Sequence, residues 1–408
     1  MAPAFRWTVA ALLFCATALS FFDRQVLSVL APRILADLRI GNVEYSNAVS
    51  AFTLAYSAMF TLGGRLVDYW GTRAGLGAAV AFWTAASLLH TGVRGAWDLT
   101  AYRFLLGVGE GGCFPGAARG ILEWFPARER ALAMGIATTG GSAMGAVLAP
   151  PLIVWVSSLV GWRGAFLATG AIGVVWVAVW FLLYRKPDAP PEPSAAPLET
   201  PWPMKRLVAR REVWGLLIAR FLFDPVFYFY MFWIPQYLSR ERGASLEEIG
   251  KLAWIPFLTL GISSLLGGAL SDSLVRRGWS INRARKAVMA AAAFLTPVSI
   301  LALVAPDSFW AVTLLAVLMF AHGFWMTNYM TMIGDLFPAS SVGTVVGLTG
   351  TAGGVAGFLS SLAVGRIVEA VSFTPVMLAC GVLYPAALAV LLIAIPRIER
   401  LANTAAAA

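Results

Sequence analysis

The stretch GGRLVD at residues 63–68 has a counterpart 204 residues later, GGALSD at residues 267–272. Two further landmarks repeat at nearly the same distance, with offsets of 212 and 213 residues. They are EWFP at 123–126 with DLFP at 335–338, and the paired glycines at 140–141 with those at 353–354. Three landmarks at nearly one spacing indicate that the chain contains two copies of one structural unit.

The composition places this repeat in a membrane. Of the 408 residues, 59% are hydrophobic and only 12% are charged, whereas a soluble domain is about 25% charged. Apolar runs of about 20 residues recur from end to end, and each is long enough to cross a hydrocarbon core of roughly 30 Å. Segments of about 10 residues with alternating polarity, as in a transmembrane barrel, do not occur. The chain is therefore predicted to be an all-α integral membrane protein.

The apolar runs predict twelve transmembrane helices, six before the join between the two copies and six after it. Their predicted limits are 8–32, 46–66, 75–94, 98–122, 133–157, 162–184, 213–238, 249–270, 285–305, 309–333, 342–366 and 373–395. The predicted organisation is an N-terminal bundle (1–185), a cytoplasmic linker (186–212) and a C-terminal bundle (213–408). The linker contains a Pro-rich stretch and is expected to hold a short interfacial helix around 204–211. Two parallel repeats of this kind enclose a substrate site that opens to each side in turn.

The net charge of +9 follows from loops rich in Lys and Arg. With both termini cytoplasmic, 19 basic residues fall on the inner side and 8 on the outer side, in agreement with the positive-inside rule. No basic, aromatic-interleaved domain points to nucleic acid. The three cysteines lie in apolar spans, so no disulfide framework is expected.

Four charged residues interrupt the apolar spans: Asp23 and Arg24 in the first, and Arg103 and Glu110 in the fourth. A charge at the bilayer centre costs roughly 2.5–3.5 kcal/mol, so such residues face a protein interior or a watery path. An Arg fork binds a carboxylate bidentately, and a buried carboxylate can carry a proton. Together these residues predict a pathway for a charged substrate. The alternative is static charge balance between neighbouring groups.

The spacing of these charges suggests which can meet. Asp23 and Arg24 are adjacent, so their side chains point about 100° apart and should have different partners. Arg103 and Glu110 are seven residues apart, roughly 10 Å along one helix face, and need a third group to couple. Of the two arginines, Arg24 is the favoured substrate ligand; the alternative for each is that it only neutralises a neighbouring acid.

Other polar and aromatic residues are candidates for the rest of the substrate. Asn328 offers donors and an acceptor for hydroxyl groups, or an interhelical hydrogen bond. Thr139 and Ser142 either line the pocket or serve helix packing, and Trp325, Trp233, Trp254 and Tyr228 either face a ring or pack in the core. His322 is expected to be structural, as are Arg220 and Asp224, which are spaced to pair on one helix face.

The sequence GRLVDYWGTR at residues 64–73 resembles the loop signature of the major facilitator superfamily. Within it, FDR at 22–24 and RFLLGVGE at 103–110 resemble the anion:cation symporter branch, which includes hexuronate and galactonate transporters. The resemblance implies the major facilitator fold. It also implies that Asp23 and Glu110 carry protons, that Arg103 tunes Glu110, and that Tyr56 contacts substrate. It further implies that charged residues at the cytoplasmic helix ends act as conformational latches: Asp68, Arg73, Glu123, Asp272 and Asp335.

These observations predict a proton-coupled symporter of organic carboxylates, favouring sugar acids such as hexuronates or aldonates. The expected partners are a small organic anion, protons and the lipid bilayer. The protein is expected to be a monomer in the cell inner membrane, with no cofactor. Alternatives are a carrier of non-sugar or aromatic acids, a non-transporting sensor on the same fold, and a drug exporter, which Arg24 disfavours. No Walker loop, metal-ligand cluster or nucleophile–base pair indicates an enzyme.

Overall fold

The computed structural model describes residues 3–187 and 201–401, and these residues form helices and short connections without any strand. Nine helices within this part of the chain are long and apolar enough to cross a membrane. The prediction of an all-α membrane protein is thereby confirmed. Residues 188–200, which make up most of the predicted linker, lie outside the described residues. Its predicted short helix is present as α7.

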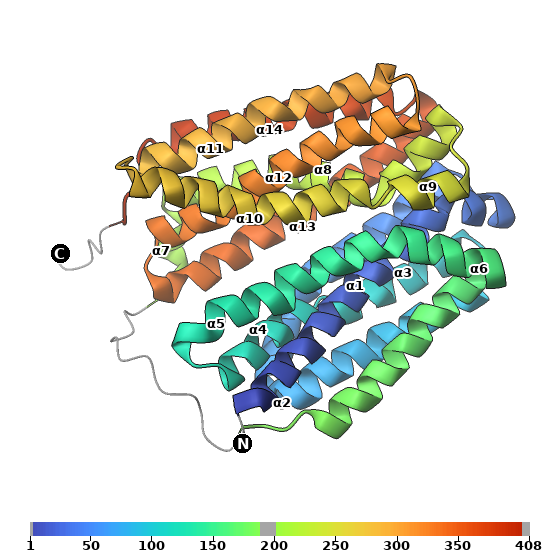
Figure 1. Cartoon of the computed structure of the whole chain (residues 1–408), viewed down its shortest axis with the longest axis horizontal. Helices are drawn as coiled ribbons and strands as arrows, with labels where there is room; N and C mark the ends of the chain where they lie inside the picture. Colours follow the sequence, from blue (N-terminus) through green and yellow to red (C-terminus); the bar gives the residue numbers. More distant parts are fainter. Residues whose placement is uncertain (1–2, 188–200, 402–408) are drawn as a thin grey trace.

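Figure 1 shows the helices in two groups, with α1–α6 on one side and α7–α14 on the other. The first group comprises α1 (Pro3–Leu38), α2 (Asn42–Leu89), η1 (His90–Gly92), α3 (Ala96–Glu110), α4 (Cys113–Trp124), α5 (Ala127–Met134), η2 (Gly135–Gly140) and α6 (Gly141–Leu183). The second comprises α7 (Met204–Val208), α8 (Arg211–Arg242), α9 (Leu246–Leu252), α10 (Ile255–Arg276), α11 (Ile281–Leu295), η3 (Thr296–Val304), α12 (Ser308–Leu336), α13 (Ala339–Ala370) and α14 (Thr374–Ala394).

Glycines explain why the continuous helices and the predicted spans do not correspond one to one. Gly71, with φ of 79°, interrupts α2 between the predicted spans 46–66 and 75–94. Gly161, with φ of 75°, interrupts α6 in the same way. Positive φ is accessible to glycine without strain. Conversely, the predicted span 98–122 is divided into α3 and α4 at Gly111 and Gly112. The count of twelve spans therefore stays a prediction.

Close approach of helices in the first group positions the candidate residues. A Cβ added at Gly145 in α6 would lie 2.1 Å from the carbonyl oxygen of Ala18 in α1. One added at Gly107 in α3 would lie 2.4 Å from the carbonyl oxygen of Phe52 in α2. Small residues allow this contact between backbones in membrane bundles. As a result α1 packs closely on α6 and α3 packs closely on α2. The helices α1 and α3 carry the four buried charges.

The two groups contact each other mainly through α1 with α8 and α2 with α13. Near one end, the hydroxyl of Ser28 donates to the carbonyl oxygen of Met231 at 3.0 Å, and that of Tyr45 donates to Phe232 at 2.5 Å. The amide of Asn42 donates to the carboxylate of Glu369 at 2.6 Å. These contacts join α1 and α2 to α8 and α13 and close this end of the interface.

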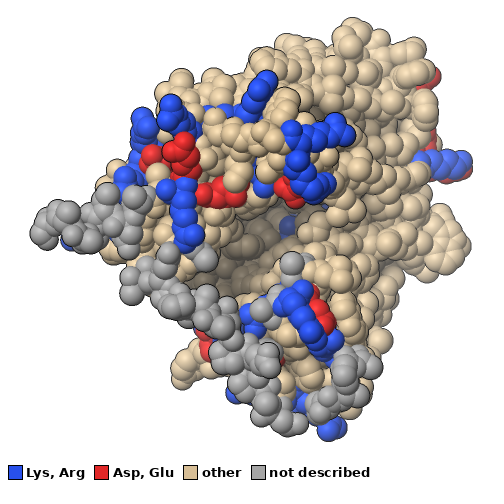
Figure 2. All heavy atoms as spheres, turned by 60° about the vertical axis from the view of Figure 1, so that its left-hand side comes forward, with Lys and Arg blue, Asp and Glu red and all other residues tan. Residues whose placement is uncertain are grey.

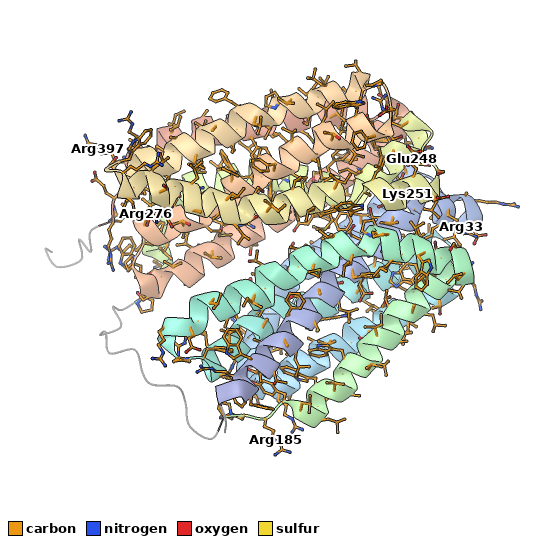
Figure 3. All side chains as sticks on the ribbon, in the orientation of Figure 1. Arg33, Arg185, Glu248, Lys251, Arg276 and Arg397 are labelled. Atoms are coloured by element: carbon orange, nitrogen blue, oxygen red, sulfur yellow. The ribbon has the colours of Figure 1, made fainter. Side chains whose placement is uncertain are left out.

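Charged side chains mark the two ends of the molecule (Figure 3). Arg33, Glu248 and Lys251 lie at the closed end, called here the α9 end. Arg276 and Arg397 lie at the opposite end, called the α7 end, and Arg185 lies at the lower edge, beyond the last turn of α6. This separation agrees with the predicted topology, which assigns the second set to the cytoplasmic side; the orientation of the termini stays a prediction.

Candidate binding site

A cavity of about 460 Å³ lies between the two groups of helices, with residues of α1, α2, α6, α8, α10 and α12 in its wall. Small-molecule sites are typically concave, mostly apolar and about 300–1,000 Å³. Figure 2, turned so that the α7 end comes forward, shows the molecule deeply hollowed there, with Lys, Arg, Asp and Glu around the hollow. Access to the space between the groups is therefore open at the α7 end and closed at the α9 end.

Arg24 and Glu110 form an ion pair at this cavity. The Nε of Arg24 donates to the Oε2 of Glu110 at 2.6 Å, and the Arg24 and Glu110 side chains are 4% and 0% exposed. The hydroxyl of Ser20 donates to the same carboxylate oxygen at 2.8 Å, while the second oxygen of Glu110 has no hydrogen-bond partner among the described residues. Arg24 itself lines the cavity. The structure thus joins two predicted residues whose direct contact the sequence does not reveal.

Aromatic rings surround the Arg24 guanidinium. Its central carbon lies 4.3 Å from the ring centroid of Tyr56 and 4.7 Å from that of Phe21. A cation over an aromatic face is attracted by the ring quadrupole. Tyr56 and Phe21 also line the cavity. The predicted substrate contact of Tyr56 is therefore consistent with its position, and Phe21 is a neighbour that the sequence analysis missed.

Asp23 points to a different environment, as its adjacency to Arg24 predicts. It is 2% exposed and accepts a hydrogen bond from the Ser87 hydroxyl of α2 at 3.3 Å. Ser87 in turn shares a hydrogen bond with Thr169 of α6. Asp23 has no ion pair within the described chain and does not line the cavity. Asp23 therefore has hydrogen-bond partners other than those of Arg24, although its carboxylate interacts electrostatically with Glu110.

Arg103 does not contact Glu110. It is 1% exposed, and its Nε and Nη2 atoms have no hydrogen-bond partner in the part of the chain that the structure describes. The two residues lie about two turns apart on α3, and the cation that pairs with Glu110 is Arg24. In this conformation Arg103 therefore does not act on Glu110 through a direct contact.

Thr139 lies in the cavity wall together with Thr138 and Ser142. It belongs to η2, a stretch of π-helix between α5 and α6. Such widened turns occur frequently at functional sites. The hydroxyl of Thr17 donates to the carbonyl oxygen of Ala137 at 2.6 Å, which ties η2 to α1. Thr139 is thus placed where a substrate hydroxyl can reach it.

Asn328 and Trp325 are not in the cavity wall, so the structure does not support the substrate contact predicted for them. Both side chains are fully buried. The amide of Asn328 donates to the carbonyl oxygen of Gly267 in α10 at 3.2 Å, which is the interhelical hydrogen bond left open as an alternative. Trp325 packs edge-on against Phe223 and Tyr384. On α12, the cavity is lined instead by His322, Met326 and Met330.

Arg220 and Asp224 of α8 do line the cavity, although the sequence analysis treats them as structural. They pair as their spacing predicts, with the Arg220 Nε 2.8 Å from the Asp224 Oδ2. His322, also expected to be structural, lines the cavity as well. It is stacked on Phe227 and hydrogen-bonded to the hydroxyl of Tyr384. The sequence signal that could have identified them is that these polar side chains occur within apolar spans of the second copy.

The predicted latch residues form two separate clusters. Arg119 pairs with Asp68 at 2.5 Å and with Glu123 at 2.9 Å. In the second copy, Arg285 pairs with Asp272 at 2.9 Å and lies 3.4 Å from Asp335.

Each latch cluster stays within its own group of helices, and no ion pair between these residues crosses the open end in the described structure. Arg73 donates to the carbonyl oxygen of Phe181 at 2.7 Å. The cations at the centre of the clusters, Arg119 and Arg285, were not among the predicted latch residues.

The described residues contain no group of three potential metal ligands. What they contain is a bundle of membrane-length helices around a central cavity that holds buried ion pairs and opens at one end. These features define a multi-pass membrane protein with a central cavity lined by charged side chains.

The chain belongs to the Major Facilitator Superfamily, whose family model matches residues 13–361. It is 29% identical to the hexuronate transporter of Escherichia coli strain K12, over 91% of this chain and 89% of that protein. It is 28% identical to the D-galactonate transporter of Escherichia coli O6:H1 strain CFT073, over 91% of each chain. The predicted resemblance is confirmed, and membership in this family makes the chain a transport protein rather than an enzyme.

The fold is also similar to a crystal structure of a bacterial homologue of the human lysosomal transporter Spinster, in an inward-facing and occupied conformation. The TM-score is 0.76, with 20% identity, and the match covers 97% of this chain and 96% of that one. At this identity the likeness shows the fold.

Proposed function

We propose that this protein is a proton-coupled symporter that imports sugar acids, such as hexuronates or aldonates, across the cell inner membrane. In this proposal the chain crosses the membrane twelve times, with a bundle at 1–185, a linker at 186–212 and a second bundle at 213–408. Both termini are cytoplasmic and the working unit is a monomer. The α7 end then faces the cytoplasm, and the structure represents the state open to that side.

The observation that carries the proposal is the Arg24–Glu110 ion pair at the cavity. A buried ion pair with no role beyond stability is weakly favoured, because desolvation offsets most of the Coulomb attraction. A transporter of carboxylates has a use for the pair, since the substrate carboxylate can replace the glutamate as the partner of the arginine. The relatives named for hexuronate and D-galactonate support the substrate class.

The proposed cycle couples the proton to this exchange of partners. Protonation of Glu110 weakens its hold on Arg24, and the guanidinium then receives the carboxylate of the substrate. Tyr56 and Thr139 contact the remainder of the molecule. Closure of the occupied site permits the two bundles to rock, and loss of the proton on the other side restores the Arg24–Glu110 pair and expels the anion.

Asp23 and Arg103 have supporting roles in this cycle. Asp23, which accepts a hydrogen bond from Ser87 of α2, is proposed as a second proton carrier. Arg103 supplies a fixed positive charge on the same helix as Glu110. The latch residues Asp68, Arg73, Glu123, Asp272 and Asp335 are proposed to contact the opposite bundle when the α7 end closes.

A second candidate function is transport of aromatic acids, because aromatic rings are abundant in the cavity wall. Phe21, Phe60, Phe114, Phe227 and Phe257 all line it. Such rings can stack on an aryl group as readily as on the apolar face of a sugar. The carboxylate would bind Arg24 in the same way, so the two candidates differ only in the body of the substrate.

A thermal-shift screen of the purified protein tests both candidates, since a ligand that binds the folded state raises the unfolding temperature. We expect D-glucuronate or D-galactonate to raise it, and the shift to disappear in Arg24→Gln/Glu110→Gln, which leaves no unpaired charge. Shifts only with aryl acids favour the second candidate. No shift with any carboxylate contradicts the anion-binding proposal, and binding without uptake in liposomes favours a sensor.

A further inference from the structure

The cavity has a second buried ion pair on the wall opposite α1. Arg220 and Asp224 lie four residues apart on α8, in the other group of helices, and both line the cavity. Their side chains are 13% and 9% exposed. Each group of helices thus contributes one arginine–carboxylate pair to the same space.

The two pairs use their guanidinium groups in the same way. In each, the arginine Nε is engaged by the carboxylate of the protein, at 2.6 Å for Arg24 and 2.8 Å for Arg220. The Arg24 guanidinium also contacts Ser20, at 3.4 Å from its Nη2, and Tyr56. The Nη1 of Arg220, in contrast, is buried and has no hydrogen-bond partner among the described residues.

A purely structural pair does not explain this arrangement well. A buried donor without a partner is costly, and arginines that serve stability normally satisfy their N–H groups with carbonyl or carboxylate oxygens. Asp224 is fixed in place by α13, because a Cβ at Gly353 would lie 1.8 Å from its carboxylate oxygen. The carboxylate therefore holds Arg220 in the cavity wall while its Nη1 donor stays unsatisfied within the described residues.

We propose, building on the function proposed above, that Arg220 is a second anion-binding position and that the preferred substrates are sugar acids with a carboxylate at each end. Arg24 binds one carboxylate and Arg220 binds the other. Because the two arginines belong to different groups of helices, such a molecule bridges them. Bridging draws the two bundles together around the bound substrate, and a molecule with one carboxylate engages only one of the two arginines.

D-Galactarate and D-galactonate are the matched probes, since they share a carbon skeleton and differ only in the second carboxylate. Binding of each to the full-length purified protein is measured by isothermal titration calorimetry in detergent. We expect the wild type to bind galactarate at least tenfold more tightly than galactonate. In Arg220→Gln/Asp224→Asn, which removes both charges together, we expect galactarate to weaken at least tenfold and galactonate less than threefold.

Retained galactonate binding shows that the double variant is folded. A second variant, Arg220→Lys, keeps the charge without the fork, and is expected to lose part of the galactarate preference. Equal binding of the two acids by the wild type overturns the inference, as does equal weakening of both in the double variant, which indicates a structural pair. Failure of both acids to bind the wild type contradicts the proposed function as well, so the two failures are distinguishable.

Discussion

Arg24 of α1, which lies in the wall of the central cavity, is 2.6 Å from Glu110 at the end of α3. Three local features bring them there. The glycines of α6 let α1 approach closely, those of α3 let it pack on α2, and the break at Gly111 places Glu110 at a helix end. The contact connects the residue proposed to bind the substrate with the residue proposed to carry the proton.

Replacement of Arg24 should abolish transport. We expect Arg24→Gln to reduce uptake of a sugar acid into proteoliposomes by about 100-fold, because truncating one partner of a buried charged contact typically costs several kcal/mol. Arg33→Gln on the same helix is the matched control, since Arg33 is exposed, and its uptake should stay within about twofold of wild type. Near-normal uptake by Arg24→Gln contradicts the carboxylate clamp.

Replacement of Glu110 should separate substrate binding from proton coupling. In the wild type, we expect binding to weaken as the pH rises, because deprotonated Glu110 competes with the substrate for Arg24. The amide in Glu110→Gln resembles the protonated acid, so binding should become independent of pH. Exchange of internal for external substrate should persist, whereas uptake driven by a pH gradient should fall to background.

Exposed Glu241 on α8 provides the control for that variant. Glu241→Gln should retain the pH dependence of the wild type in the same binding and uptake measurements. If Glu110→Gln accumulates substrate in response to a pH gradient as the wild type does, Glu110 is not the coupling residue, and Asp23 becomes the remaining candidate of the two.

The close contact between α1 and α6 should not tolerate a larger side chain at its glycines. Gly145→Ala puts a methyl group against the Ala18 carbonyl oxygen, so we expect it to destabilise the protein by about 1–3 kcal/mol. Gly343→Ala in α13 meets no atom within 4 Å, and should be neutral or stabilising by up to about 1 kcal/mol. Thermal unfolding in detergent compares the two, and equal unfolding temperatures are inconsistent with the close packing.

Contacts at the α9 end should set the balance between the two open states. Tyr45→Phe removes the hydrogen bond to Phe232, worth about 0.5–1.5 kcal/mol, and should raise the population open at the α9 end by about 2–10-fold. Electron paramagnetic resonance distances between spin labels at Arg33→Cys and Lys251→Cys, which lie at this end (Figure 3), measure the shift.

That experiment uses a Cys15→Ala background, because Cys15 is exposed. The matched control is Tyr69→Phe, since Tyr69 is 85% exposed and far from the closing contacts. Tyr69→Phe should leave the distance distribution unchanged. An unchanged distribution in Tyr45→Phe as well indicates that other contacts determine the closed state.

Much of the architecture is predictable from the sequence because apolar run length and internal repetition are direct consequences of the membrane and of two similar halves. The all-helical membrane class and the family are both confirmed. The helix count is harder to predict, because at a glycine such as Gly71 two helices meet across a kink of one non-helical residue, with no loop between them. Whether such a bend separates two spans depends on the surrounding packing.

The candidate site is less predictable, because helix rotation decides which side chains reach the cavity. Charge in an apolar span singles out Arg24 and Glu110, but their 2.6 Å contact joins residues 86 apart in the chain. Asn328 is polar in an apolar span for a different reason, since it bonds to α10. Arg220 and Asp224 show the opposite case, in which spacing for a local pair concealed a position at the cavity.

The most direct test is proton movement caused by the substrate itself. Wild-type protein is reconstituted into liposomes that contain a pH-sensitive dye, and a sugar acid such as D-galactonate is added outside without a pH gradient. We predict acidification of the lumen that requires both the substrate and Glu110, and that is absent in Glu110→Gln. Uptake of the acid with no change in internal pH would contradict proton symport.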